Sequence, residues 1–273
     1  MTMALISVAE LSDQLDDPDV VICDVRFHLD DHDRGRREFD SSHLPGARFV
    51  DLHAELAGTV GGGRHPLPPV ADFAALLGRI GVRPGSLVVA YDSANGATAS
   101  RLWWMLRSIG HGRAAVLDGG IQAWTAAGLE LTAEAPTVVA TVYPAAPDWT
   151  GIVDAEAVAQ SAAFGGTVID ARAPDRFRGE NEPIDPRAGH IPGAINRFHG
   201  DTVGPDGLHL STEQLAELFA GVGENPIVYC GSGVTACHDL LAMSTIGLAG
   251  ARLYPGSWSE WSAEPDREVA TGN

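Results

Sequence analysis

The sequence predicts an α/β fold that occurs twice, as two similar domains, each a mostly parallel sheet flanked by helices. Short apolar runs alternate with helical segments such as 70–77 and 212–220, a pattern typical of parallel strands joined by helical crossovers. A series of motifs occurs twice in the same order, and a proline-containing stretch without helical periodicity separates the two series. We therefore expect domains at 1–135 and 150–273, joined by a linker at 136–149.

The first repeated motif is an apolar run that ends in Asp-x-Arg, at 21–26 and again at 168–172. Such a run predicts a buried strand that reaches a polar edge of the sheet. We expect Arg26 and Arg172 to close structural ion pairs at these strand ends.

The second repeated motif is His-x-Pro-Gly-Ala, at 43–47 and 190–194. It predicts type II turns, because proline presets φ at the second position of the turn and glycine accepts a positive φ at the third. The remaining matches pair 87–92 with 227–230, 96–99 with 233–236 and 119–124 with 256–261.

Composition excludes several classes of function. The formal net charge is −18, which repels phosphate backbones, so we expect no nucleic-acid partner. All 18 basic residues are arginine, so Schiff-base chemistry and a Walker A phosphate loop, which both need lysine, are excluded. No apolar run approaches the roughly 20 residues that span a membrane, so we expect no membrane partner.

The cysteine content and the first residues indicate a cellular compartment. The sequence has three cysteines, and its first residues do not resemble a secretory signal. We therefore expect free thiols in a reducing cytoplasm, and a monomer. Cys23 is expected in the core of a strand, and Cys237 in a helix as a structural residue.

The segment with the clearest chemical potential begins at Cys230. The apolar run 227–229 predicts a strand that ends at this cysteine, and we expect a helix to start near Val234. Two glycines between these elements let the backbone curl, so that successive N–H groups can form an anion-binding nest that stabilises a thiolate. Taken alone, a cysteine at a strand end is more often a small buried hydrophobic residue, but the glycine curl and the helix start that follow favour a functional thiol.

These motifs together resemble the tandem-domain rhodanese family over nearly the whole chain. The loop Cys230-Gly231-Ser232-Gly233-Val234-Thr235 resembles the 3-mercaptopyruvate sulfurtransferase branch, whereas the thiosulfate branch usually has basic residues directly after the cysteine. The resemblance implies that only the C-terminal domain is catalytic. Asp92 occupies the position that matches Cys230, and a carboxylate cannot form a persulfide.

The resemblance also implies the residues of the site. Cys230 is the nucleophile, and Gly231, Ser232, Gly233, Val234 and Thr235 form the sulfur-binding loop. Arg176 matches a family arginine that binds the substrate carboxylate, and Arg187, at a spacing that departs from the family pattern, is the candidate for a second. His65 matches a histidine placed near the loop serine. Its acidic partner in the family corresponds to His53 here, which puts a relay through His65 in doubt.

The function implied is transfer of sulfur from 3-mercaptopyruvate, through a Cys230 persulfide, to a thiol, a dithiol protein such as thioredoxin, or cyanide. No metal and no cofactor is implied. Thiosulfate sulfurtransferase activity with the same cysteine remains the alternative, followed by a non-catalytic binding module, which would generally lack the loop cysteine. A cysteine phosphatase on a related fold needs an arginine six residues after the cysteine, where this chain has Ala236.

Overall fold

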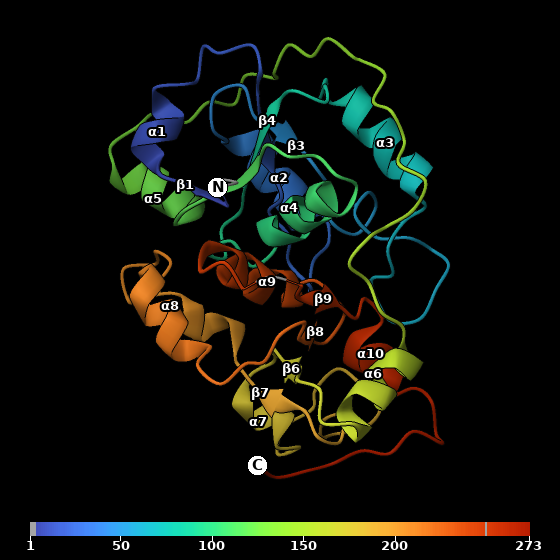
Figure 1. The fold of residues 1–273 in the computed structure, drawn as a ribbon. Helices are drawn as coiled ribbons and strands as arrows, with labels where there is room; N and C mark the ends of the chain where they lie inside the picture. The colour runs from blue at the N-terminus through green and yellow to red at the C-terminus, as the bar shows by residue number, and fades with distance from the viewer. Residues whose placement is uncertain (1–3, 249) are drawn as a thin grey trace. The chain divides into compact units, whose positions relative to one another are not determined.

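The computed structural model describes residues 4–248 and 250–273, and the chain separates into two compact units. The first unit contains the chain up to Gly58 together with Pro68–Thr150 and Pro205–His209, and the second contains Thr59–Leu67, Gly151–Gly204 and Leu210–Asn273. Figure 1 shows each unit as a sheet with helices packed around it. This confirms the predicted α/β fold with two domains.

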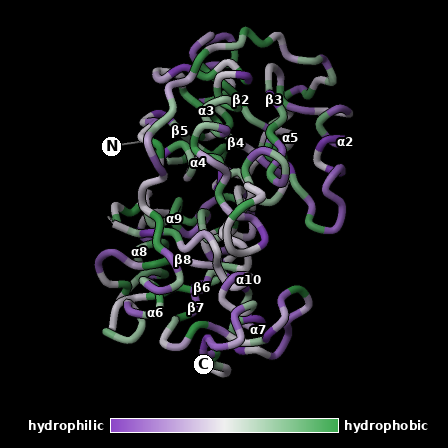
Figure 2. The backbone as a smooth tube through the Cα atoms, turned by 90° about the vertical axis from the view of Figure 1, so that its right-hand side faces the viewer, coloured by the Kyte–Doolittle hydropathy of each residue, from purple (hydrophilic) through white to green (hydrophobic). Residues whose placement is uncertain are grey.

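The first unit is built on a parallel sheet with the strand order β1-β5-β4-β2-β3. The strands are β1 (Leu5–Ile6), β2 (Val20–Asp24), β3 (Arg48–Phe49), β4 (Leu87–Tyr91) and β5 (Ala114–Leu117). The helices are α1 (Val8–Ser12), α2 (Arg34–Ser41), α3 (Val70–Arg79), α4 (Ala99–Ser108) and α5 (Gly120–Ala126). The strands are largely hydrophobic, whereas α2 carries mostly hydrophilic residues (Figure 2), so α2 presents a solvated face.

The second unit repeats this topology with the order β7-β6-β8-β9, again parallel. The strands are β6 (Val168–Asp170), β7 (Ile195–Asn196), β8 (Ile227–Tyr229) and β9 (Arg252–Leu253). The helices are α6 (Ala155–Ala163), α7 (Pro174–Phe177), the 3₁₀ helix η1 (His199–Thr202), α8 (Thr212–Leu218), α9 (Ala236–Thr245) and α10 (Ser257–Trp261). In place of β1, Ile152 forms an isolated parallel bridge with Leu253.

Alternate strand residues form the core on the two faces of each sheet. In the first unit, Leu11 of α1, Phe39 of α2 and Trp124 of α5 pack with Ile22 and Val89 in one hydrophobic cluster. Helix α4 packs against β4 and β5. The second unit has a matching cluster with members from α6, α7 and α10, and α9 packs against β8 and β9. Side chains that point to opposite faces of a strand are therefore both buried.

A buried ion pair closes the same strand end in each unit. Arg26 Nη2 lies 2.6 Å from Asp24 Oδ2 and also donates to the carbonyl of Ser42 at 2.7 Å. In the second unit, Arg172 Nη2 lies 2.6 Å from Asp170 Oδ2 and donates to the carbonyl of Gly189, also at 2.6 Å. Both predicted ion pairs are thus confirmed, and each ties a strand end to the backbone just before the next turn.

The repeated turns take the expected type II form. Ala47 N donates to the carbonyl of Leu44, and Ala194 N to that of Ile191, both at 3.0 Å. The glycines of the two turns, Gly46 and Gly193, have φ values of 73° and 80°, which side chains disfavour.

Tyrosines of the neighbouring strands anchor these turns. Leu44 N donates to the Tyr91 hydroxyl at 3.2 Å, and Ile191 N donates to the Tyr229 hydroxyl at 3.1 Å. The residue that follows each tyrosine is Asp92 in one unit and Cys230 in the other, so the repeat places these two residues at equivalent strand ends, as predicted.

Two short segments belong to a unit other than the one that the repeat predicts for them. Residues 59–67 group with the second unit because Arg64 N donates to Ser259 Oγ at 2.9 Å and His65 contacts Ser232. Residues 205–209 group with the first unit, where His209 N donates to Asp118 Oδ1 at 2.9 Å. Among the described helices, none combines the length and apolar character that crossing a membrane needs.

Helix α9 follows the Cys230 loop, and its first eight residues are all buried. It starts at Ala236, two residues later than expected, because the loop continues through Thr235. Asp239 in its first turn is fully buried, and within the described part of the chain neither carboxyl oxygen has a hydrogen-bond partner. Burial raises the pKa of this carboxyl well above its ordinary value, and negative charge at Cys230 and Asp170 acts in the same direction.

This carboxyl makes stability depend on pH. Because the folded-state pKa is raised, the folded protein keeps a proton on Asp239 that the unfolded chain loses above about pH 4, so stability falls as pH rises. Asp239→Asn removes that dependence. We expect its free energy of unfolding to gain on wild type by up to about 1.4 kcal/mol per pH unit between pH 5 and 7, measured by urea unfolding.

The matched control is Asp16→Asn at an exposed position, which should shift stability equally at all these pH values. If Asp239→Asn and wild type show parallel pH profiles, Asp239 ionises normally in the folded protein.

Candidate active site

The loop 230–235 connects β8 to α9 and begins with Cys230, which is 1% exposed. Gly233 N donates to Cys230 Sγ at 3.2 Å, so the curl of the loop directs an N–H group at the sulfur. Gly233 has a φ of 75°, and a Cβ there would lie 2.5 Å from the carbonyl oxygen of Pro255. Only glycine fits this point of the curl.

Helix α10 holds the loop from its other side. Trp258 N donates to the carbonyl of Cys230 and Ser259 N to that of Gly231, both at 2.9 Å. Ser257 Oγ accepts from Cys230 N at 3.1 Å. The backbone on both sides of the sulfur is therefore fixed, which holds the Gly233 N–H group in its direction toward the sulfur.

The loop serine has the histidine partner that the sequence suggested. Ser232 Oγ lies 2.9 Å from His65 Nδ1, and both residues are buried. His65 reaches the loop on the segment 59–67. In the first unit, Asp51 Oδ1 accepts from His53 N at 2.8 Å and from Ala54 N at 2.9 Å, so this aspartate caps its own turn.

Arg176 lies in α7 and is held by two carboxylates. Its Nη2 lies 2.7 Å from Glu182 Oε1 and 3.0 Å from Asp185 Oδ2. Glu182 also accepts from Arg172 Nη1 at 3.1 Å, which links the site to the ion pair at the end of β6. Burial acts to raise the pKa of Glu182, but the hydrogen bond and charge of Arg176 outweigh it, so the pKa lies below its ordinary value and the carboxylate stays charged.

Arg64 is the functional candidate that sequence reasoning missed. Its Nη1 donates to Asp185 Oδ1 at 2.8 Å, while its Nη2 would lie 3.2 Å from a Cβ on Gly231. Arg176 Nη1 would lie 3.5 Å from the same Cβ. Two guanidinium groups therefore meet beside Gly231, one residue from the sulfur, where a carboxylate of a substrate would find bidentate donors.

Arg187, predicted as the second arginine, occupies a different environment. Its Nε donates to the carbonyl of Ser262 and its Nη1 to that of Arg267, both at 2.8 Å. Its Nη2 donates to the carbonyls of Trp261 and Glu264. These contacts tie the chain before His190 to the C-terminal segment, and the guanidinium that lies beside Arg176 at Gly231 is that of Arg64.

The equivalent loop of the first unit contains its own anion. Asp92 Oδ1 accepts from Ala94 N and Gly96 N, and Oδ2 accepts from Thr98 N, Ala99 N and Thr98 Oγ1, at 2.7–2.9 Å. The loop at this strand end therefore binds a negatively charged group through converging N–H groups, and here the chain itself supplies that group.

The other cysteines lie in the cores of the two units. Burial raises the pKa of Cys23 to about 12, so this thiol stays protonated. Cys237 Sγ donates to the carbonyl of Gly233 at 3.4 Å, which supports the loop. In the described part of the chain no disulfide forms.

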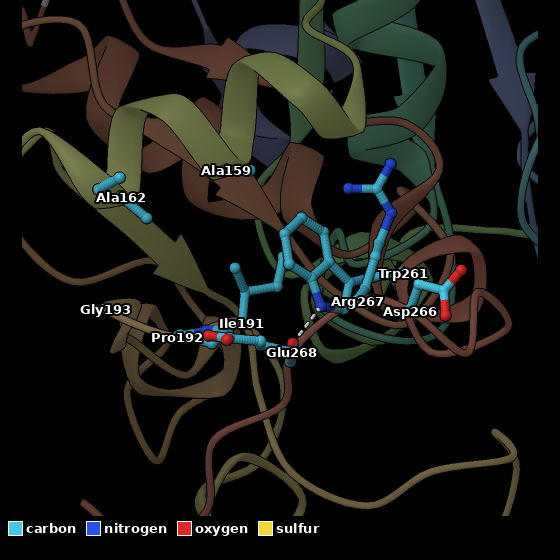
Figure 3. A pocket seen from close by; sticks show the side chains of 10 residues that line it. Ala159, Ala162, Ile191, Pro192, Gly193, Trp261, Asp266, Arg267 and Glu268 are labelled. Carbon is cyan, nitrogen blue, oxygen red and sulfur yellow. Dashed lines mark hydrogen bonds between the residues drawn. The ribbon is translucent and has the colours of Figure 1, made fainter.

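A cavity of about 500 Å³ lies elsewhere in the second unit. Figure 3 shows its lining, in which Trp261 Nε1 donates to the carbonyl of Glu268 at 2.9 Å, beside Ile191 and Arg267. None of its lining residues belongs to the loop 230–235, and it offers no thiol or hydroxyl nucleophile. We therefore place the chemistry at Cys230.

A parallel sheet that ends in a glycine-rich loop around a cysteine, with arginines beside it, defines a class of α/β proteins that use a thiol nucleophile at a strand end. The chain matches the family of rhodanese-like domains over residues 7–127 and 154–264. It therefore belongs to the rhodanese-like family, with one domain in each half.

Similar proteins span the whole chain. A probable 3-mercaptopyruvate sulfurtransferase of Pseudomonas aeruginosa is 44% identical, with 98% of each chain covered. A putative thiosulfate sulfurtransferase, SseB of Mycobacterium tuberculosis, is 43% identical over 98% of this chain and 97% of the relative. The crystal structure of SseA from Escherichia coli, described as a 3-mercaptopyruvate sulfotransferase, is 33% identical over 95% of this chain and all of the other, with a TM-score of 0.83.

The contacts of Arg187 predict a loss of stability when it is removed. Arg187→Ala strips the C-terminal loop of its charged donor and leaves several carbonyls without a partner. We expect a loss on the order of 2–3 kcal/mol in the free energy of unfolding, measured by urea unfolding. Arg178→Ala, which removes a surface arginine paired with Glu180, is the control and should cost less than about 1 kcal/mol. An Arg187→Ala variant that is as stable as wild type but cannot bind the sulfur donor would show that Arg187 binds the donor.

Proposed function

We propose that this protein is a 3-mercaptopyruvate sulfurtransferase that carries sulfur as a persulfide on Cys230. The observation that carries the proposal is the meeting of a loop cysteine with two arginines. Gly233 N donates to the sulfur, and Arg64 and Arg176 both approach Gly231, one residue away. A short donor with a carboxylate a few atoms from its sulfur suits this spacing.

In the first half-reaction, the Cys230 thiolate attacks the thiol sulfur of 3-mercaptopyruvate. The new S–S bond forms as the bond between C3 and sulfur breaks, and the electron pair stays on the organic fragment as the enolate of pyruvate. That enolate takes up one proton and leaves as pyruvate. The guanidinium groups hold the carboxylate throughout, which fixes the sulfur in line with the attacking thiolate.

The loop supplies charge stabilisation and a route for the proton. The N–H groups of the curl stabilise negative charge on sulfur before and after transfer, because they are oriented before the reaction begins. The Ser232 hydroxyl, 2.9 Å from His65 Nδ1, is a loop group that can carry the proton. In the second half-reaction, an acceptor thiolate or cyanide attacks the outer sulfur and releases the Cys230 thiolate.

The choice of donor follows from charge. Relatives of nearly equal identity carry names for mercaptopyruvate and for thiosulfate, so the identity values do not choose between the donors. Thiosulfate carries two negative charges, whereas loop residues 231–235 carry no basic side chain and the chain contains no lysine. Mercaptopyruvate carries one carboxylate, which the paired arginines can bind.

The physiological setting completes the proposal. The acceptor is a thiol, with a dithiol protein such as thioredoxin as the protein candidate. The chain acts as a monomer in the cytoplasm. The three cysteines, all free in the described part of the chain, support a reducing compartment.

The central prediction concerns the persulfide. Incubation with mercaptopyruvate followed by intact-protein mass spectrometry should show one added sulfur atom, and Cys230→Ser should abolish both the adduct and turnover. Cys23→Ser and Cys237→Ser should keep the adduct, because these thiols lie in the cores. Turnover by Cys230→Ser would show that another group carries the sulfur.

A second prediction concerns the carboxylate. Arg176→Ala should lower kcat/KM for mercaptopyruvate by the equivalent of about 1.5–3 kcal/mol, as for the loss of a charge-assisted hydrogen bond. Steady-state kinetics measures this, with Arg178→Ala, two residues away and paired at the surface with Glu180, as the matched control. An unchanged kcat/KM for Arg176→Ala would place the carboxylate elsewhere.

A further inference from the structure

Asp185 joins the two arginines of the site. Its Oδ1 lies 2.8 Å from Arg64 Nη1 and its Oδ2 lies 3.0 Å from Arg176 Nη2, so one carboxylate spans both guanidinium groups. Its side chain is 3% exposed, and Asp185 N donates to Glu182 Oε1 at 3.1 Å. Such a buried bridge between two long side chains fixes their separation, which neither arginine could do alone.

We propose that Asp185 is the residue that sets the charge selectivity for the sulfur donor, admitting a monoanion and disfavouring a dianion. The inference rests on the proposed function, because it concerns the donor that the Cys230 site takes. The side chain of Asp185 accepts from Arg64 and Arg176. It acts as a positioning residue, through Arg64 and Arg176.

The geometry of the unengaged nitrogens supports this role. Asp185 occupies Nη1 of Arg64 and Nη2 of Arg176, which turns the opposite nitrogens, Arg64 Nη2 and Arg176 Nη1, toward Gly231. Those two nitrogens lie 3.2 and 3.5 Å from the position that a Gly231 Cβ would take. A substrate carboxylate in this space would meet one N–H group from each arginine.

The charges of the cluster balance. Arg64 faces Asp185, Arg176 faces Glu182, and Arg172 faces Asp170, so each guanidinium has a carboxylate partner. The cluster therefore offers hydrogen-bond donors without net positive charge. One bound carboxylate adds a single negative charge in a partly buried space, whereas a dianion adds two, and uncompensated charge in such a space is costly.

Removal of the Asp185 charge should shift this preference toward the dianion. Asp185→Asn keeps the shape of the side chain but leaves the cluster with one net positive charge, which favours a dianion by Coulomb attraction. A purely structural salt bridge would behave differently, because its loss would weaken turnover of both donors by the same factor.

The experiment measures kcat/KM for thiosulfate and for mercaptopyruvate in wild type, Asp185→Asn, Asp185→Glu and Glu180→Gln. We expect Asp185→Asn to raise the ratio of thiosulfate to mercaptopyruvate by about tenfold or more. Asp185→Glu keeps the charge and should keep the ratio within about threefold of wild type. Glu180→Gln removes a carboxylate that pairs with Arg178 at the surface, and should leave the ratio unchanged. An unchanged ratio in Asp185→Asn, or an equal change in Glu180→Gln, would overturn the proposal.

A measurement on wild type keeps the test decisive if Asp185→Asn does not fold. Pyruvate is a monoanion and sulfate a dianion, and both can compete with the donor at the arginine pair. We expect pyruvate to inhibit persulfide formation at a lower concentration than sulfate at constant ionic strength, and stronger inhibition by sulfate would contradict the charge rule. Failure of the proposed function would look different, because no persulfide would then form on Cys230 with mercaptopyruvate in the wild-type protein.

Discussion

The ion pair between Asp170 and Arg172 is the contact on which the catalytic unit depends. Both side chains are at most 2% exposed, so separating them would leave an uncompensated charge in the interior. Asp170 lies beside Tyr229 in the sheet register, which places Cys230 one residue beyond this fixed point. Arg172 also pairs with Glu182, and its guanidinium stacks over the Trp258 ring at 4.6 Å. The same guanidinium therefore contacts both the segment that contains Glu182 and helix α10, which supports the loop.

From that ion pair a chain of contacts leads outward to the two arginines beside Gly231. Arg172 contacts Glu182, Glu182 holds Arg176, and Asp185 joins Arg176 to Arg64. Positive and negative groups alternate along this chain. The carboxylates therefore allow several arginines to lie close together near the thiol without repelling one another. The site is thus an extension of the structural core of the unit, and its rigidity has the same origin as that of the sheet.

The fold could be predicted from sequence because its determinants are local. Asp-x-Arg determines a strand end and Pro-Gly a turn, each through contacts within or near the motif. The repetition of both motifs predicts two domains. Cys230 was recognised for the same reason, as a cysteine between a strand and a glycine curl. Arg64 was missed because it meets Asp185 across 121 positions of sequence, a contact that no local pattern reports. The sequence offers Arg187 only as a candidate, at a spacing that departs from the family pattern, and its hydrogen bonds run to carbonyls 74–80 positions further on.

The carboxylate of Asp92 has a consequence for how the two halves respond to ligands. In the first unit, the loop N–H groups donate to the side chain of Asp92, which is part of the fold, so this loop needs no bound ligand to be stable. At Cys230, the corresponding side chain is a thiol whose sulfur accepts from Gly233 N at 3.2 Å, and in the proposed function this sulfur takes up a second sulfur atom from a donor. By thermodynamic linkage, a ligand that binds only the native state stabilises that state. Occupancy of the loop at Cys230 should therefore raise the stability of the second unit and leave that of the first unchanged. The repeat therefore contains one loop whose anion, Asp92, is internal and permanent, and another whose anion in the proposed function is the sulfur that it transfers.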